Sequence, residues 1–416
     1  MHQIRHLLRP PSHTNGAKPW TREAHLPPRP RMSKGHSHLP GPKQTAALRS
    51  TQPPHPADDE TRIRNRKPLG RALRSRCNKG MSAPRLAAID VGTNSVKLLV
   101  VEAGPHLQPI LETGIQTRLG EGFYPARRLQ PQAIARTVEA VRQLVERARS
   151  LGATRFRLFA TSAAREAANR QELRESLENA TGLPLEIISG LQEAEWAYLG
   201  VRSHPGMARG MVTVVEVGGG STQLVWGRDL QILLSLSLPW GAVRLWELSK
   251  LSDPPGPTQL GDLRRNLRQE IETHLVPAFR QVLSSAAVSP DEGRQPEAVA
   301  VGGTALTLAR IHLRAESWDR EALEHLRLTR EELKALVDRL AALPLAERRQ
   351  LPGLPPERAD IILTGGLIYE QITETLGLDA WRFSTRGLRY GALLSLLNDR
   401  PPRSPETCAD TTLRHD

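Results

Sequence analysis

Cysteine and aromatic residues are scarce in this sequence. Its 416 residues include two cysteines, and aromatic residues make up 4% of the chain. Both cysteines, Cys77 and Cys408, lie in polar segments near the ends of the chain. This scarcity argues against a disulfide framework or a cluster of metal-bound thiolates. We therefore expect a protein of a reducing compartment, the cytoplasm.

Long apolar runs are also missing. No stretch approaches the roughly 18 uninterrupted apolar residues of a membrane span. The first residues, MHQIRHLLRPPSH, lack the apolar core of a secretory signal. We expect no membrane partner.

Four common catalytic and nucleotide-binding motifs are absent. The sequence has no GxxxxGK[ST], no GxGxxG, no HExxH and no GxSxG. Their absence argues against a P-loop nucleotidase, a dinucleotide-binding domain, a zinc protease of this type and a serine hydrolase.

Positive charge is concentrated at one end of the chain. The net charge is +13, but residues 1–80 hold 17 Lys and Arg against four acids, and the remaining residues are formally neutral. We expect residues 1–82, which are rich in Pro and Arg, to be a disordered basic extension. It could contact polyanions, act as a transit peptide, or precede a true start at Met81. The neutral body gives no reason to expect a nucleic-acid partner.

The sequence pattern of the remaining residues predicts an α/β protein of two domains. A single core rarely grows beyond roughly 250 to 300 residues, and strand patterns alternate with helical ones. We expect domain I at 83–207, domain II at 208–398 and a disordered tail at 399–416.

The local patterns predict individual elements. Helices are expected at about 131–150, from Gln192 to near Gly200, at 258–284, and at 329–343 behind a Thr329-x-x-Glu332 capping box. Residues 204–210 are predicted to form a linker. The expected strands and strand-turn units are the hairpin 86–103, the strands 156–161 and 185–189, the hairpin 211–227, and two strand-to-glycine passages at 298–309 and 360–372.

The two hairpins repeat one pattern without a gap. Ile89-Asp-Val-Gly-Thr-Asn-Ser95 aligns with Val215-Glu-Val-Gly-Gly-Gly-Ser221. In such a turn the backbone N–H groups can cradle phosphate oxygens, while the acid at the strand end holds a divalent cation directly or through water. A single glycine turn is common, but two matching turns indicate a phosphate gripped from both sides of a cleft.

Several segments together resemble a known family. They are AAIDVGTNSVKLLV, TRLGEG (117–122), ATSAAREAAN (160–169), IISGLQEAEWAYLGV (187–201), EVGGGSTQLV (216–225), VGGTALTLA (301–309) and STRGLRYGALL (384–394). In order and spacing they are similar to the exopolyphosphatase and guanosine-pentaphosphate phosphatase (Ppx/GppA) family. The resemblance implies an α/β, two-domain actin-like (ribonuclease-H-like, ASKHA) fold with a phosphate-binding cleft between the domains, in the short form of the family.

The resemblance also implies residue roles. Glu193 matches the general base, Asp90 and Glu216 match the acids of a Mg²⁺ site, and Gly302-Gly303 match a turn that borders the nucleotide pocket of actin-like relatives. Glu195, near the base, is interpreted as a solvated carboxylate. The implied phosphate-binding residues are Gly92, Thr93, Asn94, Ser95, Arg118, Arg165, Gly218, Gly219, Gly220, Ser221 and Thr222.

One position departs from the family pattern. Gln223 stands where exopolyphosphatases of the family usually have Glu. A glutamine resembles the turn of the distantly related apyrases, in which an amide orients the attacking water. We therefore assign Gln223 to the catalytic site and expect an altered rate or metal affinity.

The resemblance leaves the substrate open. The leading hypothesis is Mg²⁺-dependent release of orthophosphate from the ends of inorganic polyphosphate, and the alternative is removal of the terminal phosphate of guanosine pentaphosphate. A non-catalytic module that binds polyphosphate or nucleotide is a third hypothesis, favoured by Gln223 and opposed by Glu193. A sugar kinase or Hsp70-like ATPase would need a further domain that the chain is too short to hold. The oligomeric state is also open, with a homodimer as one candidate.

Overall fold

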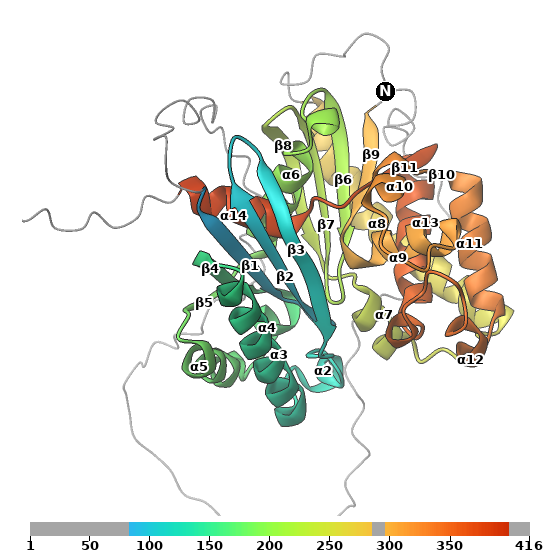
Figure 1. Ribbon diagram of the computed structural model, residues 1–416. Coiled ribbons are helices and arrows are strands. Elements are labelled where there is room, and N and C mark those ends of the chain that lie inside the picture. The colour runs from blue at the N-terminus through green and yellow to red at the C-terminus, as the bar shows by residue number, and fades with distance from the viewer. Residues whose placement is uncertain (1–82, 285–295, 399–416) are drawn as a thin grey trace, which may run out of the picture. The chain divides into compact units, whose positions relative to one another are not determined.

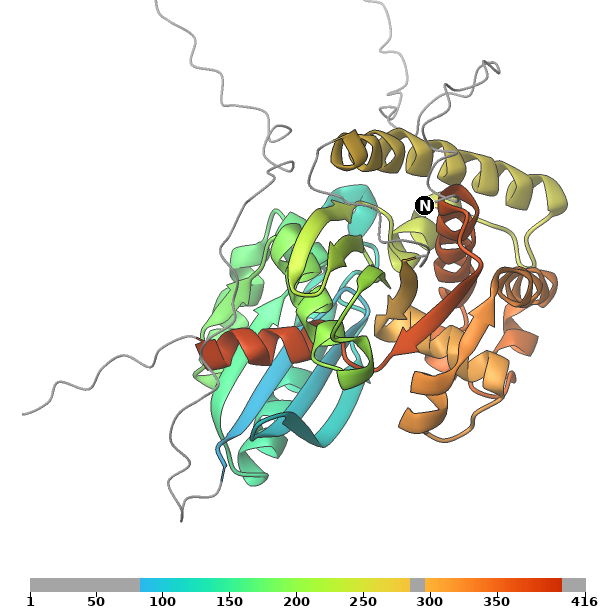
Figure 2. The ribbon, with the colours of Figure 1, turned by 90° about the horizontal axis from the view of Figure 1, so that it is seen from above.

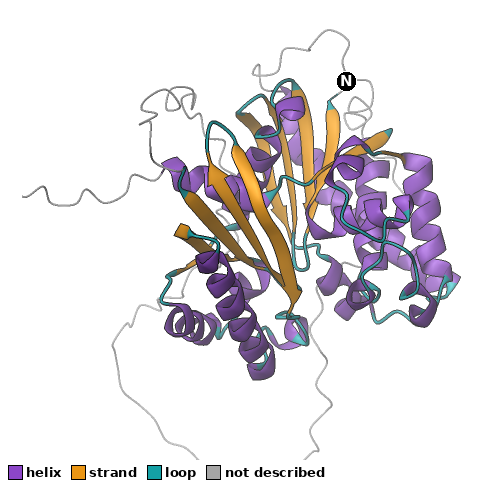
Figure 3. Ribbon diagram, in the orientation of Figure 1, coloured by secondary structure: helices purple, strands orange, loops and turns teal. Residues whose placement is uncertain are grey.

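The structure, a computed structural model, describes residues 83–284 and 296–398. These residues form two β-sheets with helices packed on their faces (Figures 1 and 3). The predicted extension, the predicted tail and both cysteines lie outside the described residues. None of the helices in the two ranges combines the length and the apolar character needed to span a bilayer.

The first sheet has five strands in the order β3-β2-β1-β4-β5. β1 pairs antiparallel with β2 and parallel with β4, and its buried residues form the middle of the sheet. The strands are β1 (Arg85–Val91), β2 (Ser95–Ala103), β3 (Leu107–Gln116), β4 (Ala153–Ala160) and β5 (Leu185–Ile187).

The second sheet repeats this arrangement and adds one strand. Its order is β10-β11-β9-β6-β7-β8, with β6 antiparallel to β7 and parallel to β9. The strands are β6 (Met211–Val217), β7 (Thr222–Arg228), β8 (Gln231–Leu238), β9 (Glu297–Val301), β10 (Arg327–Thr329) and β11 (Ala380–Ser384). The chain therefore contains two copies of one α/β unit, each beginning with one of the predicted hairpins.

Amphipathic helices cover the sheets. The predicted helix at 131–150 is confirmed as α3 (Pro131–Ser150), whose Ile134, Val141 and Leu144 are buried in the core of the first sheet. Other helices beside this sheet are α2 (Phe123–Ala126), α4 (Ser162–Glu166) and α5 (Arg170–Thr181). The second half of the chain contributes α7 (Ala242–Ser249), α8 (Pro257–Ser284), α9 (Gly302–Leu313), α10 (Arg320–His325), α11 (Arg330–Ala342), α12 (Leu345–Arg348) and α13 (Ile362–Leu376).

Two helices cross from one sheet to the other. α6 (Gly190–Arg202) follows the last strand of the first sheet, but its Ala194, Tyr198 and Val201 pack on the second sheet. α14 (Leu388–Asn398) follows the last strand of the second sheet, but it lies along the first (Figures 1 and 2), where Leu388 and Leu393 join the core. The predicted boundary between 207 and 208 falls between the strands of the two sheets, and the division into domains stays a prediction.

Most predicted elements are confirmed, and the capping box is present. Thr329 Oγ1 accepts from the Glu332 amide at 3.2 Å, and the Glu332 carboxylate accepts from the Thr329 amide at 2.8 Å. The predicted linker 204–210 is an ordered connection in which Met207 is buried. The buried Arg202 guanidinium donates to the carbonyl oxygens of Met207 and Gly210, which holds this connection in place.

The predicted strand-to-glycine passage at 360–372 is wrong. These residues belong mostly to α13, in which nearly every side chain is buried. A continuous apolar run does not by itself distinguish a buried strand from a buried helix. Gly365 and Gly366 face Thr304 and Val337, where a β-carbon would lie 2.5 Å and 3.0 Å from side-chain methyl carbons. The glycines therefore allow close helix packing rather than a turn.

The crossing helices generate a stability prediction. Gly391, inside α14, lies so close to the backbone carbonyl of Trp196 in α6 that a β-carbon would overlap it. Alanine normally favours a helix over glycine, but overpacking typically costs about 1 to 3 kcal/mol. We expect Gly391→Ala to lower the free energy of unfolding measured in urea. Gly261→Ala, in α8 beside only a flexible Arg265 side chain, is the matched control and should be neutral or stabilising. Equal stability of the two variants would contradict the close packing of α6 and α14.

Candidate active site

The two predicted turns have the same geometry. The Gly92 amide donates to the Ser95 carbonyl at 3.1 Å, and the Gly218 amide donates to the Ser221 carbonyl at 2.9 Å. Across each hairpin an acid lies opposite a polar residue, Asp90 opposite Lys97 and Glu216 opposite Gln223. The repeat expected from the sequence is therefore confirmed in three dimensions.

The first turn is braced by two segments that follow it in the chain. The Arg118 amide donates to the Asn94 carbonyl at 2.9 Å, and the Gly120 amide donates to the Thr93 carbonyl at 2.7 Å. The Ala163 amide, at the start of α4, donates to Thr93 Oγ1 at 3.3 Å. Two of the motifs used for the family resemblance, at 117–122 and 160–169, thus support the first turn.

The second turn is braced by the N-terminus of α7. The Ala242 amide donates to the Gly218 carbonyl, and the Val243 amide donates to the Gly219 carbonyl, both at 2.9 Å. Thr222 Oγ1 also donates to the Trp240 carbonyl. In both turns, backbone carbonyl oxygens are satisfied by neighbouring segments.

The bracing leaves amide donors free. Four tip amides donate to no other described residue: those of Thr93, Asn94, Gly219 and Gly220. The tips also meet, because a β-carbon at Gly219 would lie 2.9 Å from Thr93 Cβ. Successive free N–H groups of this kind form an anion-binding nest, so the geometry suits a phosphate group approached by both turns.

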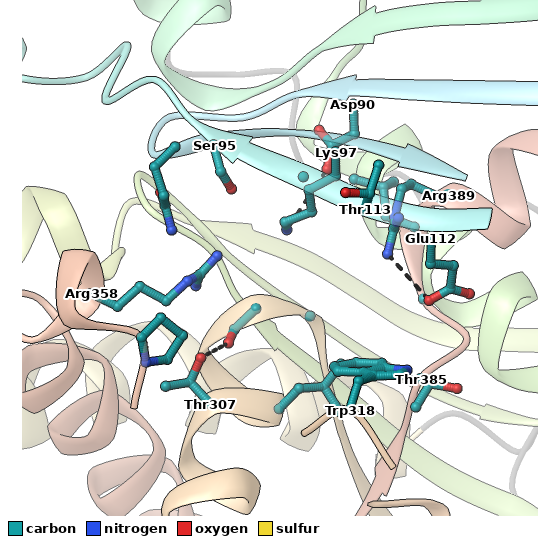
Figure 4. A pocket seen from close by; sticks show the side chains of 18 of the residues that line it. Asp90, Ser95, Lys97, Glu112, Thr113, Thr307, Trp318, Arg358, Thr385 and Arg389 are labelled. Atoms are coloured by element: carbon teal, nitrogen blue, oxygen red, sulfur yellow. Dashed lines mark hydrogen bonds and ion pairs between the residues drawn. The ribbon is translucent and has the colours of Figure 1, made fainter. Parts of the chain in front are cut away.

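A cavity of about 290 Å³ lies beside the two hairpins (Figure 4). Of the predicted site residues, its wall includes Asp90, Ser95 and Glu216, together with the turn Gly302-Gly303 at the start of α9. Figure 4 shows the side chains of Lys97 and Arg358 pointing into this space. The wall formed by the described residues does not include Glu193, Gln223, Arg118, Arg165 or the tips of the turns.

The two strand-end acids are buried and incompletely bonded. Asp90 and Glu216 are 5% and 8% exposed, and in the described part of the chain Asp90 Oδ1 and Glu216 Oε2 have no hydrogen-bond partner. Burial raises the pKa of Asp90, and it raises the pKa of Glu216 to about 7, although the Lys97 ammonium opposes both shifts. Lys97 Nζ lies 4.0 Å from Asp90 Oδ2. Asp90 Oδ1 and Glu216 Oε2 are therefore available to bind a cation.

This donor set fits a magnesium ion that shares its ligands with a phosphate. Mg²⁺ is usually held by one or two carboxylates, with water and substrate phosphate oxygens completing its shell. Over residues 83–284 and 296–398, no three His, Cys, Asp or Glu side chains gather as a complete protein ligand set. Asp90 Oδ1 and Glu216 Oε2 would supply the two carboxylate ligands.

Glu193 occupies a buried position in the first turn of α6. Ser189 caps this helix by accepting from the Gln192 amide at 3.1 Å, and Glu193 is 5% exposed. Burial raises the pKa of Glu193 to about 7; Arg165 opposes this shift, and the charges of Glu216 and Asp90 add to it. A carboxylate of this pKa is suited to proton transfer near neutral pH. Glu195 is exposed, as the sequence indicated.

Gln223 lies close to the start of α6. Its amide nitrogen donates to Ser221 Oγ at 2.9 Å and to Ser237 Oγ at 3.3 Å, and Gly190 packs directly on Ser237. The Gln223 Oε1 atom is buried and accepts no hydrogen bond from any described residue. This oxygen is available to accept a hydrogen bond from a water molecule.

The two predicted phosphate-binding arginines have protein partners. Arg165 Nη1 donates to Glu193 Oε2 at 3.1 Å and to the Ile188 carbonyl at 3.0 Å. Arg118 Nη1 pairs with Asp360 Oδ2 at 2.7 Å, and its Nη2 donates to the Glu357 carbonyl at 2.9 Å. Arg165 orients the carboxylate of Glu193, whereas Arg118 links the first turn to the segment before α13. Direct phosphate contacts of both residues stay predictions.

Sequence reasoning missed most of the cavity wall. The hairpin repeat could have identified Lys97 as a site residue. It lies opposite Asp90 in the first hairpin, as Gln223 lies opposite Glu216 in the second. Other missed residues come from the second half of the chain. Arg389 lies in the segment 384–394 used for the family resemblance but received no role, and Arg310, Trp318 and Arg358 lie in no such segment. Arg389 forms an ion pair with Glu112 of β3 at 3.9 Å (Figure 4). Only the fold brings these residues to the hairpins.

The chain resembles proteins of known family. A family model described as "Ppx/GppA phosphatase family" matches residues 99–400. Exopolyphosphatase 2 from Mycobacterium tuberculosis is 33% identical over 331 residues, which cover 76% of this chain and 99% of that protein. The guanosine-5'-triphosphate,3'-diphosphate pyrophosphatase of Aeromonas hydrophila is 30% identical over 319 residues, which cover 76% of this chain and 60% of that protein.

A solved structure confirms the expected fold. The Aquifex aeolicus PPX-GPPA enzyme superposes with a TM-score of 0.62 at 30% identity, covering 75% of this chain and 99% of that one. The actin-like α/β architecture that the family resemblance implies is therefore shown.

The buried acids predict a pH dependence of stability in the absence of metal. Because folding raises the pKa of Glu193 from 4.5 to about 7, its contribution to stability is full below about 4.5 and is lost as the pH rises through about 7. For the wild type in EDTA, the free energy of unfolding should fall between pH 5 and 8, by up to about 3 kcal/mol from this group. Glu193→Gln should show a flatter profile. Parallel urea-unfolding profiles for the two proteins would contradict the raised pKa.

Proposed function

The chain belongs to the Ppx/GppA phosphatase family, and on that basis we propose that it releases orthophosphate from the ends of inorganic polyphosphate with magnesium as cofactor. Its relatives are named as phosphoanhydride hydrolases, and the chain is an enzyme of that class. The polyphosphate substrate and the magnesium dependence are the parts that we propose. The cytoplasmic location and the homodimer stay predictions.

The observation that carries the proposal is the pair of matched turns with free amides beside the unpartnered oxygens of Asp90 and Glu216. A terminal phosphate needs donors for its oxygens and cationic compensation for its charge. The likeness to exopolyphosphatase 2 of Mycobacterium tuberculosis, at 33% identity over 331 residues, also supports polyphosphate.

The proposed mechanism assigns one task to each group. The tip amides of the two turns hold the terminal phosphate, and Glu193 accepts a proton from a water molecule aligned with the phosphorus. Arg165 keeps the Glu193 carboxylate oriented, and Gln223 Oε1 accepts a hydrogen bond from the same water. Magnesium, when bound by Asp90 and Glu216, neutralises charge on the phosphate oxygens.

One observation favours guanosine pentaphosphate as the second candidate. Trp318 is 48% exposed and lines the cavity together with Leu306 and Pro355. An exposed indole ring beside a phosphate site can stack on a nucleobase, whereas polyphosphate offers no ring. Gly302-Gly303 border the same cavity.

Phosphate release from the two substrates, measured side by side with magnesium, tests the proposal. We expect a higher kcat/KM on long-chain polyphosphate than on guanosine pentaphosphate. A Trp318→Ala variant should keep its activity on polyphosphate. The reverse preference, with loss of activity in Trp318→Ala, would favour the nucleotide and contradict the proposed substrate.

Replacing the proposed base tests its role. Glu193→Gln keeps the shape of the side chain but cannot accept the proton, so we expect kcat to fall by about two to four orders of magnitude. Binding of orthophosphate should remain. Glu195→Gln, at an exposed position two residues away, is the matched control and should retain wild-type turnover. Near-normal kcat in Glu193→Gln would remove this residue from the mechanism.

Gln223 provides a separate prediction about magnesium. Gln223→Glu adds a negative charge beside the buried acids, and we expect it to lower the magnesium concentration needed for half-maximal activity. The measurement is phosphate release over a magnesium titration. If that concentration is unchanged and Gln223→Ala is also fully active, this side chain faces neither the metal nor the water.

A further inference from the structure

A cluster beyond the predicted site residues lies where α2 meets α7. Glu247 of α7 accepts from the Gly122 amide at 2.7 Å and from the Tyr124 amide at 3.3 Å. One helical turn earlier in α7, the Arg244 guanidinium lies over the Tyr124 ring, 4.6 Å from its centroid. These contacts join the segment after the first turn to the helix that braces the second.

Two hydrogen-bond donors in this cluster lack acceptors. Tyr124 is 5% exposed and Arg244 is 7% exposed. In the described structure neither the Tyr124 hydroxyl nor Arg244 Nε makes a hydrogen bond of normal geometry. The side chains of Arg244 and Thr93 are the polar groups nearest to the hydroxyl. Burial raises the pKa of Tyr124 to about 12, with Arg244 opposing the shift, so the hydroxyl keeps its proton and can donate.

Among the described residues, two carboxylates contact this cluster, those of Glu247 and Glu166, and both already have partners. Glu166 forms ion pairs with both Arg127 and Arg244, and it accepts from Ser162 Oγ at 3.0 Å. Burying a donor without an acceptor costs about 1 to 3 kcal/mol, and more for a charged group. Two such donors in one cluster therefore indicate an acceptor that binds there, and an anionic oxygen suits the nearby guanidinium.

The unpartnered hydroxyl lies at the meeting point of the two turns. A β-carbon at Gly220 would clash with both Tyr124 Oη and Ser162 Oγ, so the second turn packs against these side chains. The Arg244 amide donates to the Gly219 carbonyl at 3.1 Å. The two free donors thus adjoin the tip amides that were assigned to the terminal phosphate.

We propose that Tyr124 and Arg244 contact the phosphate group held between the two turns, with the Tyr124 hydroxyl donating to a phosphoryl oxygen. The inference rests on the proposed function, because it places the terminal phosphate at the same turns. It adds a donor pair from α2 and α7 to the backbone cradle. Tyr124 lies two residues after the end of the TRLGEG motif, at a position to which the family resemblance assigns no role.

Tyr124→Phe separates this role from a structural one. The variant keeps the ring, which packs edge-on against Phe123 with centroids 5.1 Å apart, and removes only the unpartnered hydroxyl. Since no protein hydrogen bond is lost, Tm should be unchanged or higher. The dissociation constant for orthophosphate, measured by calorimetry on the full chain with magnesium, should rise about 10- to 100-fold.

Tyr198→Phe is the matched control. Tyr198 is also buried, but its hydroxyl donates to the Asp229 carbonyl at 2.9 Å and accepts from Arg202 at 3.0 Å. Its replacement should lower Tm and leave the dissociation constant for orthophosphate unchanged. The two tyrosines should thus show opposite patterns of stability and binding.

The outcomes separate this inference from the proposed function. Wild-type affinity for orthophosphate in Tyr124→Phe, or no detectable binding by the wild type, would overturn the inference. If binding depends on Tyr124 but neither polyphosphate nor guanosine pentaphosphate is hydrolysed, the inference stands and the proposed function fails. If polyphosphate is hydrolysed with the same KM by wild type and Tyr124→Phe, the function stands and the inference fails.

Discussion

The site depends on how the backbone carbonyl groups of two glycine-rich turns are satisfied. In the proposed site each turn points its amides toward a phosphate group, and its carbonyl oxygens then need partners elsewhere. The first turn obtains them from Arg118 and Gly120, and the second from the N-terminus of α7. Because these partners are backbone amides on ordered segments, the chain's own hydrogen bonds hold the shape of the proposed cradle. Preorganised donors of this kind lower the reorganisation needed during phosphoryl transfer.

The crossing helices make the two sheets one structural unit. α6 carries the proposed base from the end of the first sheet onto the second, while α14 returns from the second sheet to the first. Gly391 and Trp196 allow the two helices to approach closely. As a result, Glu193 lies near acids from both hairpins, and the charges of Asp90 and Glu216 both raise its pKa. The position of the base therefore depends on the contact between the two halves of the chain.

The parts of the site that repeat along the chain could be predicted from the sequence. Asp90 and Glu216 are found by aligning two hairpins, and the structure reproduces their turns in detail. Residues brought in by packing could not be found in this way. Arg358 reaches the cavity from the short 3₁₀ helix Pro356–Arg358 that precedes α13, and Tyr124 meets Gly220 where α2 contacts α7. The sequence predicts a strand passage where α13 lies, because a helix buried on all sides has no amphipathic period.

In the proposed site both turns hold one phosphate group together. The most direct test is a titration of orthophosphate, with magnesium, into protein labelled with ¹⁵N-glycine and ¹⁵N-threonine, observed through the amide resonances of the tips. If both turns hold one phosphate group, the resonances of Thr93 in the first turn and of Gly219 and Gly220 in the second should shift together, with a single dissociation constant. Shifts confined to one turn, or two different dissociation constants, would contradict it.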